Sequence, residues 1–209
     1  AITYLGVATI KELVLSVEVF RMFEDDAKNS GLCLEALHRH SAFVGDLCKK
    51  MLSSRPELIE WASLAASLHD IGKLVMAART PNRHAKALRD SRERHCSFAQ
   101  AEQQMHGITH AQLGAYLLGL WGFPYAVVDA VAGHHGPFDL SPKELDTASA
   151  VAIADMLAVE AGVNADPQAN CPQEAGVLDL DYVRACGLED LLPEWRNYAK
   201  EKADAEKRE

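Results

Sequence analysis

The sequence predicts an all-α protein, because three observations agree on helices. No stretch of useful length alternates apolar and polar residues as a half-buried strand would. Apolar residues recur mostly every three or four positions, which is the spacing of a helix with one buried face. Residues that start or stop helices bound several of these runs. We therefore expect a compact bundle of several helices.

Two apolar segments open the chain. Residues 2–22 are expected to form one helix or a pair of helices. The next helix is expected over 33–53, where one face carries an apolar stripe that contains a histidine. The stripe consists of Leu37, His40, Val44, Leu47 and Met51.

A third helix is expected to follow directly. Ser54 could cap its start, and Pro56 suits its first turn. This helix is expected to run to His69 and to stop at Gly72. The adjacent residues His69 and Asp70 therefore lie at a helix end.

The helix after residue 108 has a defined start signal. Thr109 and Gln112 have the spacing of a capping box, in which each side chain satisfies a backbone N–H of the other residue. The helix is expected to run to Trp121 and to carry His110 in its first turn.

Histidines also end the next predicted helix. It starts at Pro124 and ends at His134 and His135, because Gly136 and Pro137 do not continue a helix.

The last part of the chain alternates between helices and polar segments. A helix near 143–161 is followed by a loop rich in Pro, Asn and Gln around 164–176, and then by short helices at 179–186 and 189–199. The tail from Lys200 is nearly all charge and alanine, so we expect it to be frayed.

Size and composition exclude several classes of protein. The 209 residues fit one domain, expected over 1–199 with a charged tail at 200–209, and the chain begins with Ala1 rather than Met. No apolar run approaches membrane-spanning length, and no signal peptide opens the chain. The net charge of −9 argues against broad nucleic-acid binding. Five cysteines without a CxxC pair argue against a disulfide framework and favour the cytoplasm.

One basic window departs from this acidic average. It contains only Asp90 and Glu93 as acids and follows the His69–Asp70 pair in sequence. Two interpretations stay open: an ordinary solvated helix face, or a basic lip that attracts a phosphorylated ligand. The basic residues are Arg79, Arg83, Lys86, Arg89, Arg92 and Arg94.

Imidazoles and carboxylates occur where they could form one metal centre. His69 and Asp70 can present two side chains to one ion, and His40 is preferred to His38 because it shares the apolar stripe of its helix. A carboxylate in an apolar stripe, as at Asp155, is costly unless it is paired or bound to a metal. The complete candidate set is His40, His69, Asp70, His110, His134, His135 and Asp155.

Some candidates, taken alone, have a simpler structural explanation. A lone histidine on an apolar stripe, such as His40, is more often a satisfied core residue, and His110 could be a surface residue. The paired rings of His134 and His135 can point in different directions, one toward each of two ions. A shared centre explains the seven residues together better than seven separate causes. Three histidines fit no such pattern and are left out: His84, His95 and His106.

Five short motifs carry a family resemblance. They resemble the HD phosphohydrolase superfamily and, more narrowly, the HDOD domain, the HD-related output domain of bacterial signalling proteins and response regulators. Thr109–Ala115 and Trp121–Pro124 support the narrower likeness. The motifs are His40–Val44, Leu68–Lys73 (LHDIGK), His110–Gly114, His134–His135 and Ala154–Asp155.

The resemblance implies an HD-domain-like bundle with a dinuclear metal centre. The seven candidates would be its ligands, Asp70 would bridge two divalent ions, and Lys73 would be the cation beside the reacting phosphate. Asp70 and Lys73 would thus be the catalytic residues. Ligands without Cys favour Fe, Mn or Zn. The resemblance also implies that the first helices of the domain, and any upstream receiver domain, lie outside this chain.

One departure bears on the substrate. After His135 the chain continues as Gly136-Pro137-Phe138-Asp139, where the related HD-GYP cyclic-di-GMP phosphodiesterases carry their GYP segment. Hydrolysis of cyclic-di-GMP is therefore not expected.

Three functions stay open. The leading hypothesis is a metal-dependent phosphohydrolase or phosphodiesterase centre in a signalling output domain, acting on a phosphorylated small molecule or nucleotide. The alternative is a catalytically silent module that passes a conformational change to a sensor domain, receiver domain or protein partner. The third is a mononuclear nucleotidase, which needs only four of the seven residues: His40, His69, Asp70 and Asp155.

Overall fold

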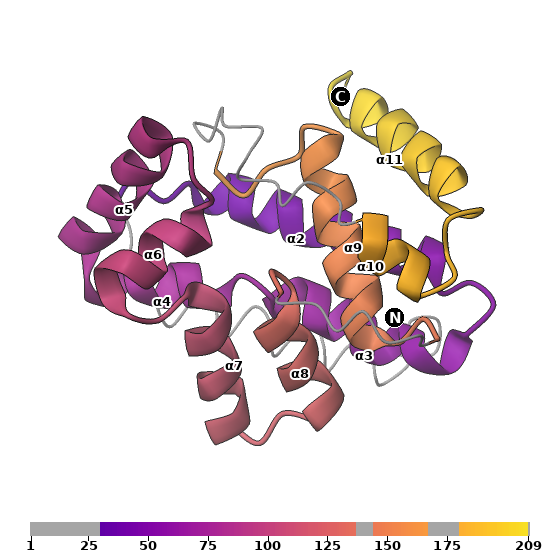
Figure 1. The fold of residues 1–209 in the computed structure, drawn as a ribbon, viewed down its shortest axis with the longest axis horizontal. Helices are drawn as coiled ribbons and strands as arrows, with labels where there is room; N and C mark the ends of the chain where they lie inside the picture. Colours follow the sequence, from indigo (N-terminus) through magenta and orange to yellow (C-terminus); the bar gives the residue numbers. More distant parts are fainter. Residues whose placement is uncertain (1–29, 137–143, 167–179, 209) are drawn as a thin grey trace.

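The structure is a computed structural model that describes residues 30–136, 144–166 and 180–208. Within these ranges the regular elements are all helices, so the predicted all-α bundle is confirmed (Figure 1). The helix expected over 2–22 lies outside the described residues, as does most of the predicted loop 164–176. The helices are α2 (Leu34–Met51), α3 (Pro56–Leu68), α4 (Ile71–Arg79), α5 (Pro81–Arg94), α6 (Phe98–His106), α7 (His110–Leu120), α8 (Tyr125–Gly133), α9 (Thr147–Glu160), α10 (Leu180–Ala185) and α11 (Leu192–Glu206).

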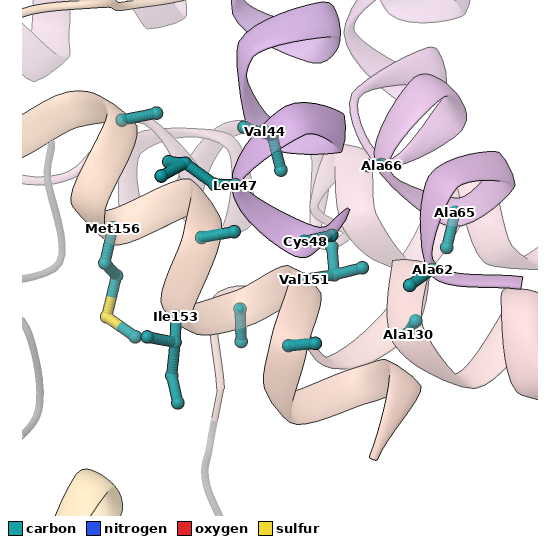
Figure 2. Packing of buried hydrophobic residues seen from close by; sticks show 14 of the residues in the cluster. Val44, Leu47, Cys48, Ala62, Ala65, Ala66, Ala130, Val151, Ile153 and Met156 are labelled. Carbon is teal, nitrogen blue, oxygen red and sulfur yellow. The ribbon is translucent and has the colours of Figure 1, made fainter. Parts of the chain in front are cut away.

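The core lies where α2, α3, α8 and α9 pack together. Alanines on α3, α8 and α9 leave room for neighbouring helices to approach closely, while longer side chains fill the space between them (Figure 2). This packing fixes the helices that carry the candidate site. The residues labelled there are Val44, Leu47 and Cys48 from α2, Ala62, Ala65 and Ala66 from α3, Ala130 from α8, and Val151, Ile153 and Met156 from α9.

The helix boundaries around the His-Asp pair differ from the prediction. The third helix ends at Leu68, and its N-cap is Arg55 rather than Ser54. Gly72 does not stop a helix but lies inside α4. A Cβ atom at Gly72 would lie 2.0 Å from the carbonyl oxygen of His110, so this glycine serves the close approach of α4 to α7. The prediction failed because a glycine needed for packing looks like one that ends a helix.

The two predicted starts of α7 and α8 agree with the structure. Thr109 and Gln112 form the capping box, with Gln112 Oε1 accepting from the Thr109 backbone N–H at 3.1 Å and Thr109 Oγ1 accepting from the Gln112 N–H at 3.2 Å. Pro124 is the N-cap of α8. These local signals therefore place His110 at the start of α7.

The charged tail was expected to be frayed, and this is wrong. The last helix continues to Glu206 and buries Trp195, Ala199 and Ala203 on one face. Lys202 Nζ lies 2.9 Å from Asp46 Oδ2, which joins α11 to α2. The prediction failed because a helix rich in alanine can dock through small side chains while its charges stay on the outer face.

Candidate metal centre

All seven predicted ligand residues converge in one place. They come from α2, the α3–α4 junction, α7, the end of α8 and α9. Six of them are buried, and His135 is the most exposed. Their ligand atoms form two groups, each with all atoms within 4.8 Å of one another: His40, His69 and Asp155, and Asp70, His110, His134 and His135.

The first group surrounds one point between α2, α3 and α9. The Nε2 atoms of His40 and His69 lie 3.2 Å apart. Asp155 Oδ1 lies 2.9 Å from His40 Nε2 and 3.9 Å from His69 Nε2. Asp155, predicted to need a partner, therefore has two imidazoles of its own group beside it, and His135 Nδ1 of the second group lies 3.7 Å from its Oδ2.

The second group lies beside the first. The Nε2 atoms of His110 and His135 are 2.9 Å apart. Asp70 Oδ1 is 3.3 Å from His110 Nε2 and 3.7 Å from His134 Nε2. The other oxygen of Asp70, Oδ2, is 3.6 Å from His69 Nε2 in the first group. Asp70 thus faces both groups at once.

Hydrogen bonds on the far side of four rings determine which ring nitrogens face inward. A carbonyl or carboxylate oxygen can only accept, so each Nδ1 must carry the hydrogen, and Nε2 of a neutral ring then has an unshared electron pair. The pairs are His40 Nδ1 with Val163 O at 2.8 Å, His69 with Ala66 O at 2.7 Å, His134 with Val131 O at 2.7 Å, and His110 with Glu102 Oε2 at 2.5 Å.

This arrangement leaves electron pairs facing one another. Neutral His40 and His69 cannot hydrogen-bond through two unprotonated Nε2 atoms, so their approach needs a cation between them, either a proton or a metal ion. Asp70 Oδ1 and His134 Nε2 are buried without a hydrogen-bond partner in the described part of the chain. Buried polar atoms are rarely left this way. The donor set therefore fits a divalent metal.

The charges of the site favour the same occupant. Burial would raise the pKa of both Asp70 and Asp155. At Asp70 the neighbouring Lys73 and imidazoles outweigh burial, and at Asp155 imidazoles do so, which holds both pKa values below the usual range. Burial lowers the pKa of His69 to about 4, so this ring is neutral at pH 7. For His40, the hydrogen bond and charge of Asp155 outweigh burial and raise the pKa. Two ionised carboxylates thus lie among imidazole nitrogens.

Comparison with known proteins identifies the family of this chain. The family model of the HDOD domain matches residues 1–137. The chain belongs to the HDOD family. No curated protein matches its sequence.

Two solved structures share the fold of this HDOD chain at low sequence identity. One is an HDOD domain protein of unknown function from Geobacter sulfurreducens, with TM-score 0.65 and 20% identity, covering 96% of this chain and 72% of the other. The second is described as a "putative phosphohydrolase" from Shewanella amazonensis SB2B, with TM-score 0.66 and 20% identity, covering 97% of this chain and 75% of the other. At this identity they establish the fold alone.

Lys73 lies in the first part of α4 of the HDOD domain, at the edge of the two groups. Its Nζ is 2.8 Å from Asp70 Oδ2, and its side chain is 15% exposed. Burial would lower the pKa of Lys73, but the charge and hydrogen bond of Asp70 raise it, so the amine is charged. The predicted catalytic pair Lys73 and Asp70 is therefore in direct contact, although its role stays a prediction.

Glu102 is a residue of the site that the sequence patterns did not identify. It is fully buried on α6, and its Oε2 accepts from both Nδ1 and the backbone N–H of His110. A carboxylate behind a ligating histidine fixes the ring orientation and increases its basicity. The available signal was the same as for Asp155: Glu102 shares a helix face with Phe98 and Ala101, which are buried.

A cavity of about 970 Å³ opens over the centre. Lys73, His110, His134 and Asp155 line it, together with residues of α5, α6 and the segment after α9. Among the described residues that line the cavity, the window Arg79–Arg94 contributes only His84 and Leu88, and both are uncharged. The structure thus favours the solvated-face interpretation of that window over a basic lip.

In the described ranges, no helix is both long and apolar enough to cross a membrane.

Proposed function

We propose that this HDOD domain holds two divalent metal ions and is a metal-dependent phosphohydrolase centre in a cytoplasmic bacterial signalling protein. The observation that carries the proposal is a set of four imidazoles whose Nδ1 atoms are occupied by backbone or carboxylate acceptors. Their Nε2 atoms therefore face Asp70 or Asp155. Each of the two ligand groups would hold one ion, and Asp70 faces both groups.

Phosphate-ester hydrolysis is the chemistry that fits these ligands. Paired divalent ions in a His/carboxylate site lower the pKa of a bound water and neutralise charge that develops on phosphate oxygens. Asp70 and Asp155 supply the negative charge that retains the ions, and both stay ionised at neutral pH.

Lys73 has the position of a charge-stabilising residue. Among the described residues that line the cavity, Lys73 is the only Lys or Arg. Its contact with Asp70 keeps the ammonium group charged and oriented. A preorganised ammonium group at the rim of the centre stabilises negative charge on a phosphoryl oxygen without having to reorganise. We assign it this role in the transition state.

Metal analysis of the purified protein tests the centre directly. We expect about two ions of Fe, Mn or Zn per chain, and a clear loss of metal in Asp70→Ala. The matched control is Asp190→Ala, which removes an exposed aspartate of the segment before α11. Metal well below one ion per chain in the unchanged protein would refute the proposal, and a single ion at saturation would replace it with the mononuclear nucleotidase.

Catalysis needs a separate experiment. The metal-loaded protein is assayed against a panel of phosphomonoesters, nucleotides and phosphodiesters. We expect Lys73→Ala to keep its metal and to lose turnover by about 10²–10³-fold, while Lys86→Ala on the exposed face of α5 keeps full activity. Metal binding without turnover of any compound would favour the silent output module, which would act through an upstream receiver or sensor domain or a protein partner.

A further inference from the structure

The cavity is much larger than the metal centre requires. Its volume of about 970 Å³ lies at the upper end of small-molecule pockets, whereas a phosphoryl group fills only a small part of such a space. The remainder extends from the centre toward α5, the start of α6 and the segment after α9. We call this part the distal subsite and define it by Leu32, His84, Leu88, Phe98, Asn164 and Ala165.

His84 is the most informative residue of the distal subsite. Its side chain is buried at 1% exposure, yet neither ring nitrogen has a hydrogen-bond partner in the described part of the chain. Burial lowers the pKa of His84 to about 4, so the ring is neutral at pH 7 and offers one N–H donor and one acceptor nitrogen. Since an unpaired buried polar group is costly, these atoms are suited to a bound ligand.

Asn164 supplies a second unpaired group on the same wall. Its Oδ1 is buried without a hydrogen-bond partner among the described residues. The preceding residue, Val163, accepts the hydrogen bond of His40, so the same segment serves the metal centre and the distal subsite. Arg92 on the helix of His84 bonds Asp166 at 2.9 Å, which fixes α5 to this segment.

The other four residues of the distal subsite are apolar, and the cavity carries little positive charge. Leu32, Leu88, Phe98 and Ala165 line this part of the cavity. Phe98 packs edge-on against His84 with ring centroids 5.3 Å apart. Among the described lining residues Lys73 is the only Lys or Arg, and it is already paired with Asp70, while Asp129 and Asp166 add negative charge. A chain of further phosphates would find no cation here.

We propose that the distal subsite binds the uncharged heterocyclic base of a nucleotide that carries a single phosphoryl group. Apolar walls fit the flat faces of a base, and the unpaired groups of His84 and Asn164 fit its edge, where donors and acceptors alternate. A sugar alone would leave the apolar walls without a partner. The placement of the phosphoryl group rests on the proposed metal centre, whereas the recognition of the base does not.

Binding measurements on the metal-loaded protein test this assignment. The probes are inorganic phosphate, adenosine monophosphate, guanosine monophosphate and the corresponding nucleoside triphosphates, each followed by calorimetry. We expect at least one monophosphate to bind more than tenfold tighter than inorganic phosphate and tighter than its triphosphate. His84→Leu should weaken that monophosphate about fivefold to tenfold and leave phosphate affinity and metal content unchanged.

Two further variants separate recognition from folding. Asn164→Ala should weaken the same monophosphate, and His106→Leu, a histidine on α6 outside the cavity lining, should not. Thermal melting shows whether each variant folds. If phosphate and both monophosphates bind equally to the folded metal-loaded protein, or if His84→Leu and Asn164→Ala change nothing, the distal subsite is refuted while the metal centre stands. If the purified protein binds no metal, the proposed metal centre is refuted. Binding of the nucleoside, which lacks the phosphoryl group, then tests the distal subsite by itself.

Discussion

Glu102 contacts His110 at two points of the same residue. One carboxylate oxygen, Oε2, accepts from the backbone N–H of His110 at 2.9 Å and from its ring Nδ1 at 2.5 Å. Both side chains are fully buried. The position of the His110 ring is thereby tied to the start of α7, so this ring cannot rotate independently of its helix.

Replacing Glu102 with Gln should weaken metal binding about 10- to 100-fold, which is the usual effect of losing the partner behind a ligating histidine. The amide keeps the size of the side chain but removes the charge that increases the basicity of His110. Competition with a chelator measures the affinity for Mn²⁺. Glu93→Gln, on the exposed side of α5, is the matched control. Equal affinity in the two variants would contradict the role assigned to Glu102.

Gly72→Ala should destabilise the fold and disturb the centre. The added Cβ would meet the backbone of His110, with its carbonyl oxygen at 2.0 Å and its carbonyl carbon at 2.7 Å. Backbone atoms cannot turn aside as a side chain can, so we expect a loss of about 3 kcal/mol or more. Urea denaturation measures it. Gly45→Ala on α2 is the control, because its Cβ would meet only Ala66 at 3.9 Å. A milder effect at Gly72 than at Gly45 would refute the packing argument.

Acid should destabilise the metal-free protein partly through His84. Burial lowers the pKa of this residue from 6.5 to about 4 on folding. Between these values the unfolded chain binds the proton and the folded chain does not, so stability is full above pH 6.5 and falls as the pH drops toward 4. The contribution is about 3 kcal/mol. Denaturation curves at pH 7 and pH 4.5 should show a smaller loss for His84→Leu than for the unchanged chain; the same loss in both would exclude this cause.

Removing the metal should lower the melting temperature. A ligand at about 100 times its dissociation constant stabilises a fold by about 2.7 kcal/mol, which corresponds to about 5–10 °C for a chain of this size. We expect a chelator to produce this shift and added Mn²⁺ or Zn²⁺ to reverse it. Asp70→Ala serves as the control, since its melting should no longer respond to either. An unchanged melting temperature in the native chain would argue against an occupied centre.

Stripe geometry and capping signals predicted much of the site. His40 shares the buried stripe of α2 while His38 is exposed, as their positions on the helix suggested. The capping box of α7 placed His110 correctly because both partners are local in sequence. Features that depend on a neighbouring helix were missed. Gly72 was mistaken for a helix end since its contact with α7 is formed only in three dimensions.

Two buried polar residues were also overlooked, although their helices contained the signal. His84 shares a buried face with Ala87, Leu88 and Ser91, and Glu102 lies beside Ala101. The cost of burying a polar group, which singled out Asp155, applied equally to them. The sequence alone could not identify His110 as the partner of Glu102, because the two residues belong to different helices, α7 and α6.

The ligands also span a long stretch of chain. His40 belongs to α2 and Asp155 to α9, and their side chains meet in one candidate ligand group. Cys33, Cys48 and Cys96 are free thiols. An ion bound here would act as a cross-link between α2 and α9: it would close a loop of more than one hundred residues, much as a disulfide does in secreted proteins. Unlike a disulfide, such a cross-link opens and closes with the supply of metal, so resistance to proteolysis would report metal availability.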